Sequence, residues 1–257
     1  MSITGSIKRV LYRTLPLEGY LRVLSAGFFA GLGLGLGRRD GGVYEYPRFL
    51  RRVARPGDVA IDMGANLGYY SRVLSRLVGS EGRVWAVEPV LPVLKVLRHN
   101  LRRCRNVEIV PCALGAENRT LTMVNDSARA AGYMGTGQNR VPEYGEARGG
   151  AGAMEFEVEM RRGSELFGGL ERLDFIKCDI EGYERVVIPE MEAVILKHLP
   201  VVLIETGGAN RRPMIELFRE WGYAGYVLQR GRLVSVMRAP EKDIFFIPGH
   251  RHKELCE

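Results

Sequence analysis

The sequence predicts an α/β fold, in which a roughly seven-stranded and mostly parallel sheet carries helices on both faces. Two observations predict it. Short apolar runs, typical of strands buried on both faces, alternate along the chain with stretches whose apolar residues recur at helical spacing. The chain has 257 residues, of which 46% are hydrophobic and 26% are charged. This composition excludes a wholly disordered chain, and the length suits one domain with additions.

The first 43 residues are expected to form a helical extension of a domain that spans 44–257. An apolar stretch over 24–36 is shorter than the roughly 17–25 residues of a membrane-spanning helix. Arg38 and Arg39 follow it, where a signal cleavage site needs small residues. We therefore expect a cytoplasmic protein whose extension packs on the domain. Contact of residues 1–40 with a membrane surface and cover over a lipid-like substrate are the alternatives.

The domain is expected to begin with a helix over 44–53 and a turn over 55–58 that leads into the first strand. The apolar run 59–61 forms this strand, Asp62 ends it, and a glycine-containing turn over 64–68 precedes the next helix. Glycine lets a ligand approach the main chain closely, and the start of a helix offers unpaired N–H groups. The turn is therefore a candidate ligand site.

The spacing within this turn favours one kind of ligand. Asp62 precedes Gly64 by two residues, and the next glycine is Gly68, which gives the pattern D-x-G-x-x-x-G. The pattern differs from the G-x-G-x-x-G of dinucleotide-binding folds. It resembles the cofactor loop of S-adenosylmethionine-dependent methyltransferases. For the glycines taken alone, an ordinary strand-to-helix turn is the alternative.

A second strand is expected over 83–88, followed by a helix over 94–104 and a third strand over 107–112. Glu88 ends the second strand 26 residues after Asp62 (88 − 62 = 26). This is close to the roughly 20-residue spacing at which an acid meets ribose hydroxyls in dinucleotide folds. The alternative is an acid that merely ends a strand and caps the next helix.

An insertion is expected at about 119–160. Residues 119–124 and 154–160 alternate polar and apolar side chains, which predicts a pair of strands. The segment 125–153 between them is rich in Gly, Ala, Asn and Arg. Long irregular loops in compact domains are usually functional or disordered, and residues 132–135 are the part of greatest interest.

The remaining chain returns to alternating strands and helices. Strands are expected over 173–179, 200–205, 223–228 and 244–247, with a helix after Glu184 and another capped by Asn210. The carboxyl ends of parallel strands meet at one edge of the sheet, where ligands bind. Four acids should therefore converge there: Asp62, Glu88, Asp179 and Glu205. For Glu184 we favour the role of a first-turn helix acid.

Several motifs together identify a family. They are Asp62-Met63-Gly64-Ala65-Asn66-Leu67-Gly68-Tyr69-Tyr70, Gly82-Arg83-Val84 with Val87-Glu88-Pro89, Cys112-Ala113-Leu114-Gly115, and Phe175-Ile176-Lys177-Cys178-Asp179-Ile180-Glu181-Gly182-Tyr183-Glu184. Over roughly 44–247 the chain resembles the FkbM family of S-adenosylmethionine-dependent methyltransferases. The resemblance implies a class I, Rossmann-like methyltransferase fold and, most often, O-methylation of a sugar or other secondary-metabolite hydroxyl.

The chain departs from the family pattern in two places. Arg162-Gly163-Ser164 stands where many members have Thr-Leu-Asp, and Pro189-Glu190-Met191 replaces a small residue after the helix that follows the fourth strand. A role for the family's aspartate is therefore not carried over, and the packing of that helix is left open.

The cofactor expected from these features is S-adenosylmethionine. The residues expected to contact it are Asp62, Gly64, Ala65, Asn66, Gly68, Tyr69, Glu88, Pro89, Cys112, Ala113 and Asp179. The methyl acceptor is expected to approach over Asp179, Glu181 and Glu205, with Glu181 or Asp179 as general base. No metal site is predicted, because no histidine or tight ligand spacing supports a divalent ion between Asp179 and Glu205.

The expected partner is a small-molecule, glycan or glycolipid acceptor. Lys and Arg number 37 against 30 acids, a net charge of +7 that a nucleic-acid methyltransferase would exploit. The sequence shows no aromatic residues interleaved on a basic stripe, so this reading is an alternative. A non-catalytic S-adenosylmethionine-binding protein is the second alternative. The four widely spaced cysteines predict neither a disulfide framework nor a zinc site, and the oligomeric state is left open.

Overall fold

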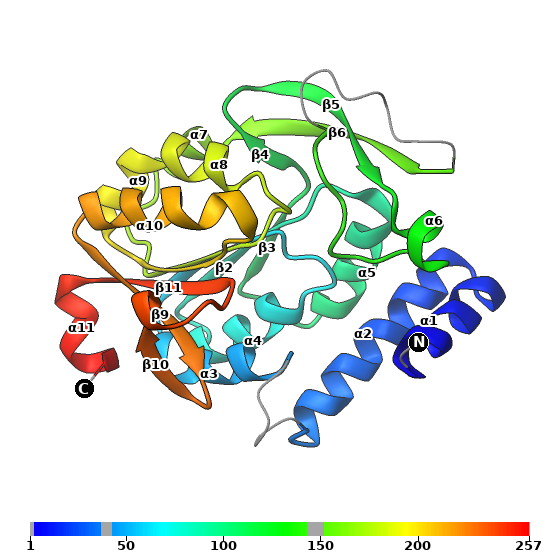
Figure 1. Ribbon diagram of the computed structural model, residues 1–257, viewed down its shortest axis with the longest axis horizontal. Helices are drawn as coiled ribbons and strands as arrows, with labels where there is room; N and C mark the ends of the chain where they lie inside the picture. The colour runs from blue at the N-terminus through cyan, green and yellow to red at the C-terminus, as the bar shows by residue number, and fades with distance from the viewer. Residues whose placement is uncertain (1–2, 37–42, 143–151, 257) are drawn as a thin grey trace.

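The structure, a computed structural model, describes residues 3–36, 43–142 and 152–256. Parts of two predicted segments, 37–42 of the extension and 143–151 of the long loop, lie outside the described residues. An eight-stranded sheet forms the centre, with strand order β10-β9-β11-β8-β7-β1-β2-β3 (Figure 1). Its strands are β1 (Val59–Met63), β2 (Arg83–Val87), β3 (Val107–Val110), β7 (Phe175–Cys178), β8 (Val201–Glu205), β9 (Tyr223–Gln229), β10 (Arg232–Ser235) and β11 (Asp243–Pro248).

The order of the strands creates a switch point beside β1. The chain proceeds outward from β1 to β2 and β3, and then crosses back to β7 and β8, all in parallel pairs. Strand β11 runs antiparallel to both β8 and β9. The predicted α/β fold is confirmed. The prediction missed β10, which forms a hairpin with β9 through Arg230 and Gly231, both at positive φ.

The sheet is apolar on both faces, and helices cover each face. Successive strand residues point to opposite faces, so Ala60 and Ile61 belong to different core clusters, as do Phe245 and Phe246. Figure 1 shows α8, α9 and α10 on one side of the sheet and α3 and α4 on the other. The helices of the domain are α3 (Glu45–Val53), α4 (Tyr69–Val78), α5 (Leu91–Leu101), α7 (Gly163–Phe167), α8 (Glu184–Glu190), α9 (Glu192–His198), α10 (Arg211–Glu220) and α11 (Gly249–Cys256), with single 3₁₀ turns η1 (Gly208–Asn210) and η2 (Val236–Arg238).

Two N-terminal helices, α1 (Ile3–Thr14) and α2 (Leu17–Gly33), lie against the domain. Tyr20 and Leu21 are fully buried, and α2 contacts both α4 and α5. An ion pair of 3.2 Å between Lys95 Nζ and Glu18 Oε1 joins α5 to α2. Within the described residues, no helix combines the length and the apolar character that crossing a bilayer requires.

A second, three-stranded sheet is formed by the insertion. It has the order β4-β6-β5 and consists of β4 (Ala113–Gly115), β5 (Arg119–Asn125) and β6 (Met154–Arg162), with the short helix α6 (Ser127–Ala131) after β5. β5 and β6 pair antiparallel, and β4 pairs parallel with β6. Met123 and Val158 of this sheet share a core cluster with Tyr20 and Val93. The insertion and the N-terminal helices therefore pack on the same side of the domain, around α5.

The two departures from the family pattern contact each other. The main-chain N–H of Ser164 donates to Glu190 Oε2 at 3.1 Å, and Arg162 Nε donates to Glu190 Oε1 at 3.0 Å. A Cβ at Gly163 would lie only 2.5 Å from Met191 Sδ, so the glycine makes room for the methionine. The unusual residues in these two segments are therefore matched to each other.

Candidate functional site

The turn after β1 is held by main-chain hydrogen bonds to the neighbouring strand. The N–H groups of Gly64 and Ala65 both donate to the carbonyl oxygen of Val87, at 3.1 and 2.8 Å. Gly64 has φ +76°, and a Cβ built on it would lie 1.9 Å from the carbonyl oxygen of Asp179. Glycine is required here because the turn after β1 touches the main chain at the end of β7.

We expect Gly64→Ala to destabilise the fold far more than Gly57→Ala. Both glycines have positive φ, +76° and +85°, so both variants carry the left-handed penalty of roughly 1–2 kcal/mol. Only Gly64 faces backbone, since a Cβ at Gly57 meets nothing within 4 Å among the described residues. The clash should raise the loss in the free energy of unfolding to about 3–5 kcal/mol. Urea unfolding checks this, and equal losses for the two variants would contradict the close approach.

Glu88 joins the turn to the second strand end. Its carboxylate is buried, and Oε2 accepts a hydrogen bond from the N–H of Asn66 at 3.0 Å while Oε1 accepts one from the N–H of Val90 at 2.9 Å. Burial raises the pKa of Glu88 to about 7, although these two N–H groups act in the opposite direction. Each carboxylate oxygen keeps a second lone pair. Glu88 can therefore accept two hydroxyl hydrogen bonds from a ligand in addition to its structural ones.

A pocket opens in front of Glu88, and it brings most of the predicted site residues together. Eight of them line it: Gly64, Asn66, Glu88, Pro89, Cys112, Ala113, Asp179 and Glu181. Its other lining residues are Val87, Val90, Leu114, Met123, Thr136, Gly137, Asn139, Val141, Ile180 and Tyr183. The buried Oδ1 of Asn66 has no hydrogen-bond partner among the described residues. An apolar slot beside a carboxylate and an unpartnered amide oxygen fits a nucleoside.

Five predicted site residues do not line this pocket. Asp62 is fully buried beneath the turn and accepts a hydrogen bond from Ser71 Oγ at 2.5 Å, while Ala65 and Gly68 pack against α5. Tyr69 lies against Phe28 of α2, with the two rings tilted and their centroids 4.3 Å apart. The Glu205 carboxyl group interacts with that of Asp179. These residues position the turn and the acids, and contact of their side chains with a cofactor stays a prediction.

Lys177 is a site residue that the sequence analysis missed. It is buried in β7, and its Nζ donates to Asp179 Oδ2 at 2.9 Å while lying 5.0 Å from the ring centre of Tyr70. Burial lowers the pKa of Lys177, but the carboxylates of Asp179 and Asp62 outweigh it and raise the pKa overall. Burial likewise opposes ionisation of Asp179, but Lys177 dominates and lowers its pKa. A lysine inside the apolar strand LDFIKCD was the signal in the sequence.

Two further acids stand next to this ion pair. Glu181 has φ +55° and its side chain is exposed in part. Partial burial of its carboxylate, followed by the charges of Asp179 and Glu205, raises its pKa to about 8. Burial and then the charge of Asp179 raise the pKa of Glu205 to about 7. Lys242 Nζ lies 3.7 Å from Glu205 Oε1. The ionised carboxylate of Asp179 is thus flanked by Glu181 and Glu205, which hold a proton near neutral pH.

Glu184 and Asn210 hold the loop that carries Glu181. Glu184 lies in the first turn of α8, and its Oε1 accepts hydrogen bonds from the N–H groups of Ile180 and Gly182, at 2.9 and 3.3 Å. Asn210 occupies the predicted N-cap position of α10, but its side chain makes no cap hydrogen bond. Its Nδ2 instead donates to the carbonyl oxygen of Gly182 at 3.1 Å. Both side chains therefore serve the site loop.

The roof of the pocket comes from the insertion, although not from the residues singled out in the sequence. Met134 is fully buried, and its carbonyl oxygen accepts a hydrogen bond from Tyr20 at 2.9 Å. The residues of this loop that line the pocket follow Met134 and are Thr136, Gly137, Asn139 and Val141. Asn125 Nδ2 donates to Asn139 Oδ1 at 2.8 Å and fixes this segment. No pattern in the loop's composition marked these residues.

Metal ligands and cysteines are two further kinds of group that could carry chemistry at the site. Among the residues that the structure describes, no group of three or more His, Cys, Asp or Glu is arranged to hold a metal ion. Within the described part of the chain, the cysteines at 104, 112, 178 and 256 form no disulfide. Burial raises the pKa of Cys112 to about 11, so its thiol is neutral in the pocket wall.

Comparisons with known proteins identify a family and two similar proteins. The family model described as "Methyltransferase FkbM domain" matches residues 62–224. The methyltransferase sdnD of Sordaria araneosa is 27% identical over 186 residues, which cover 62% of this chain and 71% of that protein. The AMB antimetabolite synthetase AmbE of Pseudomonas aeruginosa is 25% identical over 182 residues, covering 60% of this chain and 8% of that protein.

Among solved structures, the methyltransferase FkbM from Methylobacillus flagellatus is 17% identical, with a TM-score of 0.47. The alignment covers 78% of this chain and 50% of that one, so the chain spans half the length of this matched structure.

Proposed function

Because the chain belongs to the FkbM family of methyltransferases, we propose that it transfers a methyl group from S-adenosylmethionine to a hydroxyl oxygen of a sugar, glycolipid or secondary metabolite. Family membership assigns methyl transfer as the class of reaction and S-adenosylmethionine as the cofactor. The acceptor, the oxygen as attacking atom and the roles of individual residues are the proposal.

The observation that carries the proposal is the sign of the charge at the pocket's edge. Asp179 and Glu181 line this edge, and Lys177 lowers the pKa of Asp179 and keeps it ionised. Glu205 and Asp243, which are opposite each other in the register of β8 and β11, lie next to Asp179 and add two acids whose pKa values are raised to about 7 and about 6. S-adenosylmethionine carries a cationic sulfonium and a cationic ammonium, which such an edge attracts. The anionic pyrophosphate of a dinucleotide would meet the same carboxylates and be repelled. Titration calorimetry with S-adenosylmethionine and NAD⁺ side by side tests this distinction.

The residues of the pocket fit the parts of this cofactor. Glu88 would accept hydrogen bonds from the ribose hydroxyls, and Pro89, Cys112 and Ala113 would enclose the adenine. When bound, the cofactor supplies an electrophilic methyl group. The main chain from Gly64 to Gly68 would hold the methionine end.

The chain's own contribution to the rate is chiefly positioning. Orienting two reactants is worth about 7–11 kcal/mol, whereas general-base help contributes about 10²–10⁴-fold. Lys177 holds Asp179 in place and keeps its carboxylate ionised. This carboxylate can orient the substrate hydroxyl by accepting its hydrogen bond. Glu181 loses its proton as the pH rises through about 8, and its ionised form can then act as a general base.

We expect methyl transfer to rise with pH through about 8 and then level off, because the Glu181 base must be ionised to accept the hydroxyl proton. Asp179, Glu205 and Glu184 raise this pKa and Lys177 lowers it. The cationic sulfonium of bound S-adenosylmethionine would lower the pKa of Glu181 further. The pH at the midpoint of the rise in kcat should therefore lie below the corresponding pH for kcat/KM. Glu181→Gln should lower kcat about 10²–10⁴-fold and remove the pH-dependent step.

Steady-state kinetics over pH 6–9.5 check this expectation. Glu157→Gln, on the exposed side of β6, is the matched control and should keep the wild-type profile. A wild-type rate and pH profile in Glu181→Gln would remove Glu181 as the base, leaving Asp179 as the candidate.

The proposed reaction is tested with methyl-labelled S-adenosylmethionine and panels of polyhydroxylated acceptors, including sugars, glycolipids and cell extracts. The expected result is label in an O-methyl ether, identified by NMR of the product, with one S-adenosylhomocysteine formed per methyl transferred. A product with the labelled methyl group on nitrogen or carbon would contradict O-methylation, and label in RNA alone would contradict the proposed class of acceptor. Tight cofactor binding without turnover on any panel would favour the non-catalytic alternative.

A further inference from the structure

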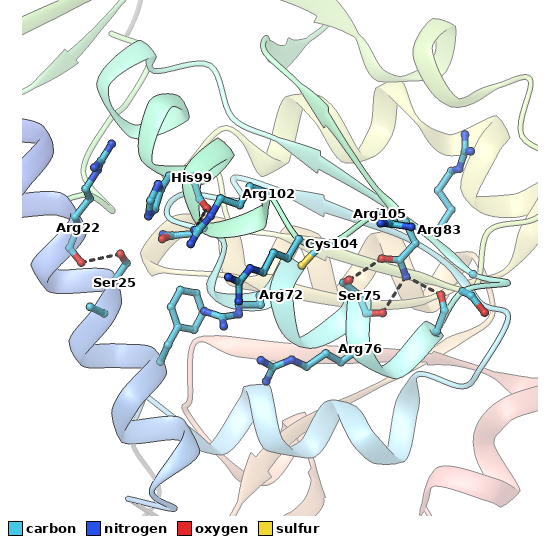
Figure 2. A pocket seen from close by; sticks show the side chains of 18 residues that line it. Arg22, Ser25, Arg72, Ser75, Arg76, Arg83, His99, Arg102, Cys104 and Arg105 are labelled. Carbon is cyan, nitrogen blue, oxygen red and sulfur yellow. Dashed lines mark hydrogen bonds between the residues drawn. The ribbon is translucent and has the colours of Figure 1, made fainter.

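A groove lined by arginines lies on the outside of the domain, between α2, α4 and α5 (Figure 2). Its volume is about 1050 Å³. Figure 2 shows Arg22 and Ser25 on α2, and Arg72, Arg76 and Arg102 on the opposite side of the groove. The arginines that line it without an acidic partner are Arg22, Arg72, Arg76, Arg102, Arg103 and Arg105.

The positive charge of these arginines is uncompensated. Within the part of the chain that the structure describes, no carboxylate lies within 4.0 Å of those six guanidinium groups, whereas the seventh, Arg83, reaches Glu108 at 3.5 Å. Burial and then the charge of Arg76 lower the pKa of Arg72, which stacks 4.4 Å from the ring centre of Phe29. Like charges held together in a concave surface favour an anionic ligand.

The groove is separate from the cofactor pocket, since the two share no lining residue. The groove contains Gly82 and Arg83 at the start of β2, whereas the pocket contains Glu88 just beyond the end of that strand. Five strand residues at about 3.3 Å each place roughly 16 Å between them. The arginines therefore lie too far from the cofactor pocket to contact the reacting groups.

Exposed apolar side chains lie next to the groove. Of the ten large hydrophobic residues that the described structure exposes, six belong to residues 3–43, with exposures of 44% to 79%. They are Ile7, Val10, Val23, Leu34, Leu36 and Val43. At 100° per residue, Val23 and the C-cap residue Leu34 fall on one stripe of α2, about 100–140° around the helix from the stripe of Arg22 and Phe29 that lines the groove. The same helix therefore presents a basic stripe to the groove and an exposed apolar stripe on a neighbouring face.

We propose that α1, α2 and the arginine groove form a docking surface for an anionic phospholipid bilayer. The lipid phosphates would enter the groove, and the exposed aliphatic side chains beside it would enter the headgroup layer. RNA would satisfy the arginines as well, but it would leave Val23 and Leu34 in water. Among the described residues that line it, the groove offers RNA two aromatic rings for stacking, Phe29 and His99, and the ring of Phe29 is already covered by Arg72.

The test is flotation of the full chain with vesicles of phosphatidylcholine alone and of phosphatidylcholine with 30% phosphatidylglycerol. We expect binding to the anionic vesicles only, weakening as salt rises. Arg102→Glu with Arg103→Glu should lower the partition coefficient about thirtyfold or more, because each basic residue near an anionic membrane surface contributes about fivefold and two are removed. Val23→Asn with Leu34→Asn should lower it at every salt concentration, because it removes an apolar contribution.

The matched control is Arg212→Glu with Arg219→Glu on α10, which makes the same change in net charge on the opposite side of the sheet. It should keep wild-type vesicle binding, and thermal melts should show all three double variants folded. Equal loss in the control and the groove variant would overturn the proposal. Two other results would overturn it. One is that the wild-type chain binds RNA hairpins but shows no preference for anionic vesicles. The other is that the chain binds free glycerol phosphate in the groove but does not float with vesicles.

Discussion

Replacing Asp179 with asparagine is expected to damage both stability and catalysis. Lys177 Nζ would lose its partner at 2.9 Å while remaining buried in β7, and a buried charge without its partner costs about 3–5 kcal/mol. Because the Asp179 side chain is 31% exposed and Asp62 still neutralises the lysine in part, we expect a loss of about 2 kcal/mol in the free energy of unfolding. Urea unfolding measures it.

The catalytic part of this loss is separable from the structural part. Adding Lys177→Met removes the unpaired buried cation, so the double variant should recover at least half of the lost stability. The rate of methyl transfer should stay about a hundredfold below wild type in both variants, since neither orients the acceptor. If activity returned together with stability, Asp179 would be a structural residue only.

Replacing Glu88 with glutamine is expected to raise the dissociation constant for S-adenosylmethionine about a hundredfold. The amide NH₂ would face either the N–H of Asn66 or that of Val90, so a donor would meet a donor at one end. The ribose would also lose hydrogen bonds to a charged group, which are worth about 1.5–3 kcal/mol. Titration calorimetry measures the change.

Glu108→Gln is the matched control, because Glu108 lies on the neighbouring strand β3 with 52% of its side chain exposed. It should bind the cofactor as wild type does. Burial raises the pKa of Glu88 to about 7, so wild-type affinity should fall as the pH drops below that value and the carboxylate takes up a proton. The glutamine variant should lack this pH dependence. Unchanged affinity in Glu88→Gln would mean that the ribose lies elsewhere.

The position of the cofactor pocket could be predicted from the sequence because its signals are local. Gly64 and Glu88 each stand directly after a strand, and the ends of parallel strands meet at one edge whatever else the chain does. The apolar runs of these strands also fixed the sheet, since strands buried on both faces lack alternation. Eight of the predicted site residues accordingly line one pocket.

The partners of the acids depended on the tertiary structure. Asp62 and Lys177 are opposite each other in the register of β1 and β7, although 115 positions separate them in the chain (177 − 62 = 115). Asn210 was predicted as a cap, but it binds the loop at Gly182 instead. A residue's type indicates which hydrogen bonds it can make, whereas its partner is decided by the strand register and the packing that bring distant segments together.

The sequence by itself determined the α/β fold, the family and the edge of the sheet at which the proposed cofactor pocket lies. Only the tertiary structure decided which acid is held ionised by Lys177, which loop residues cover the pocket, and that seven arginines share one groove. The physical reason is that periodicity and turn chemistry act over a few neighbouring residues. The charge that a group experiences depends on burial and on side chains contributed by elements far apart in the chain.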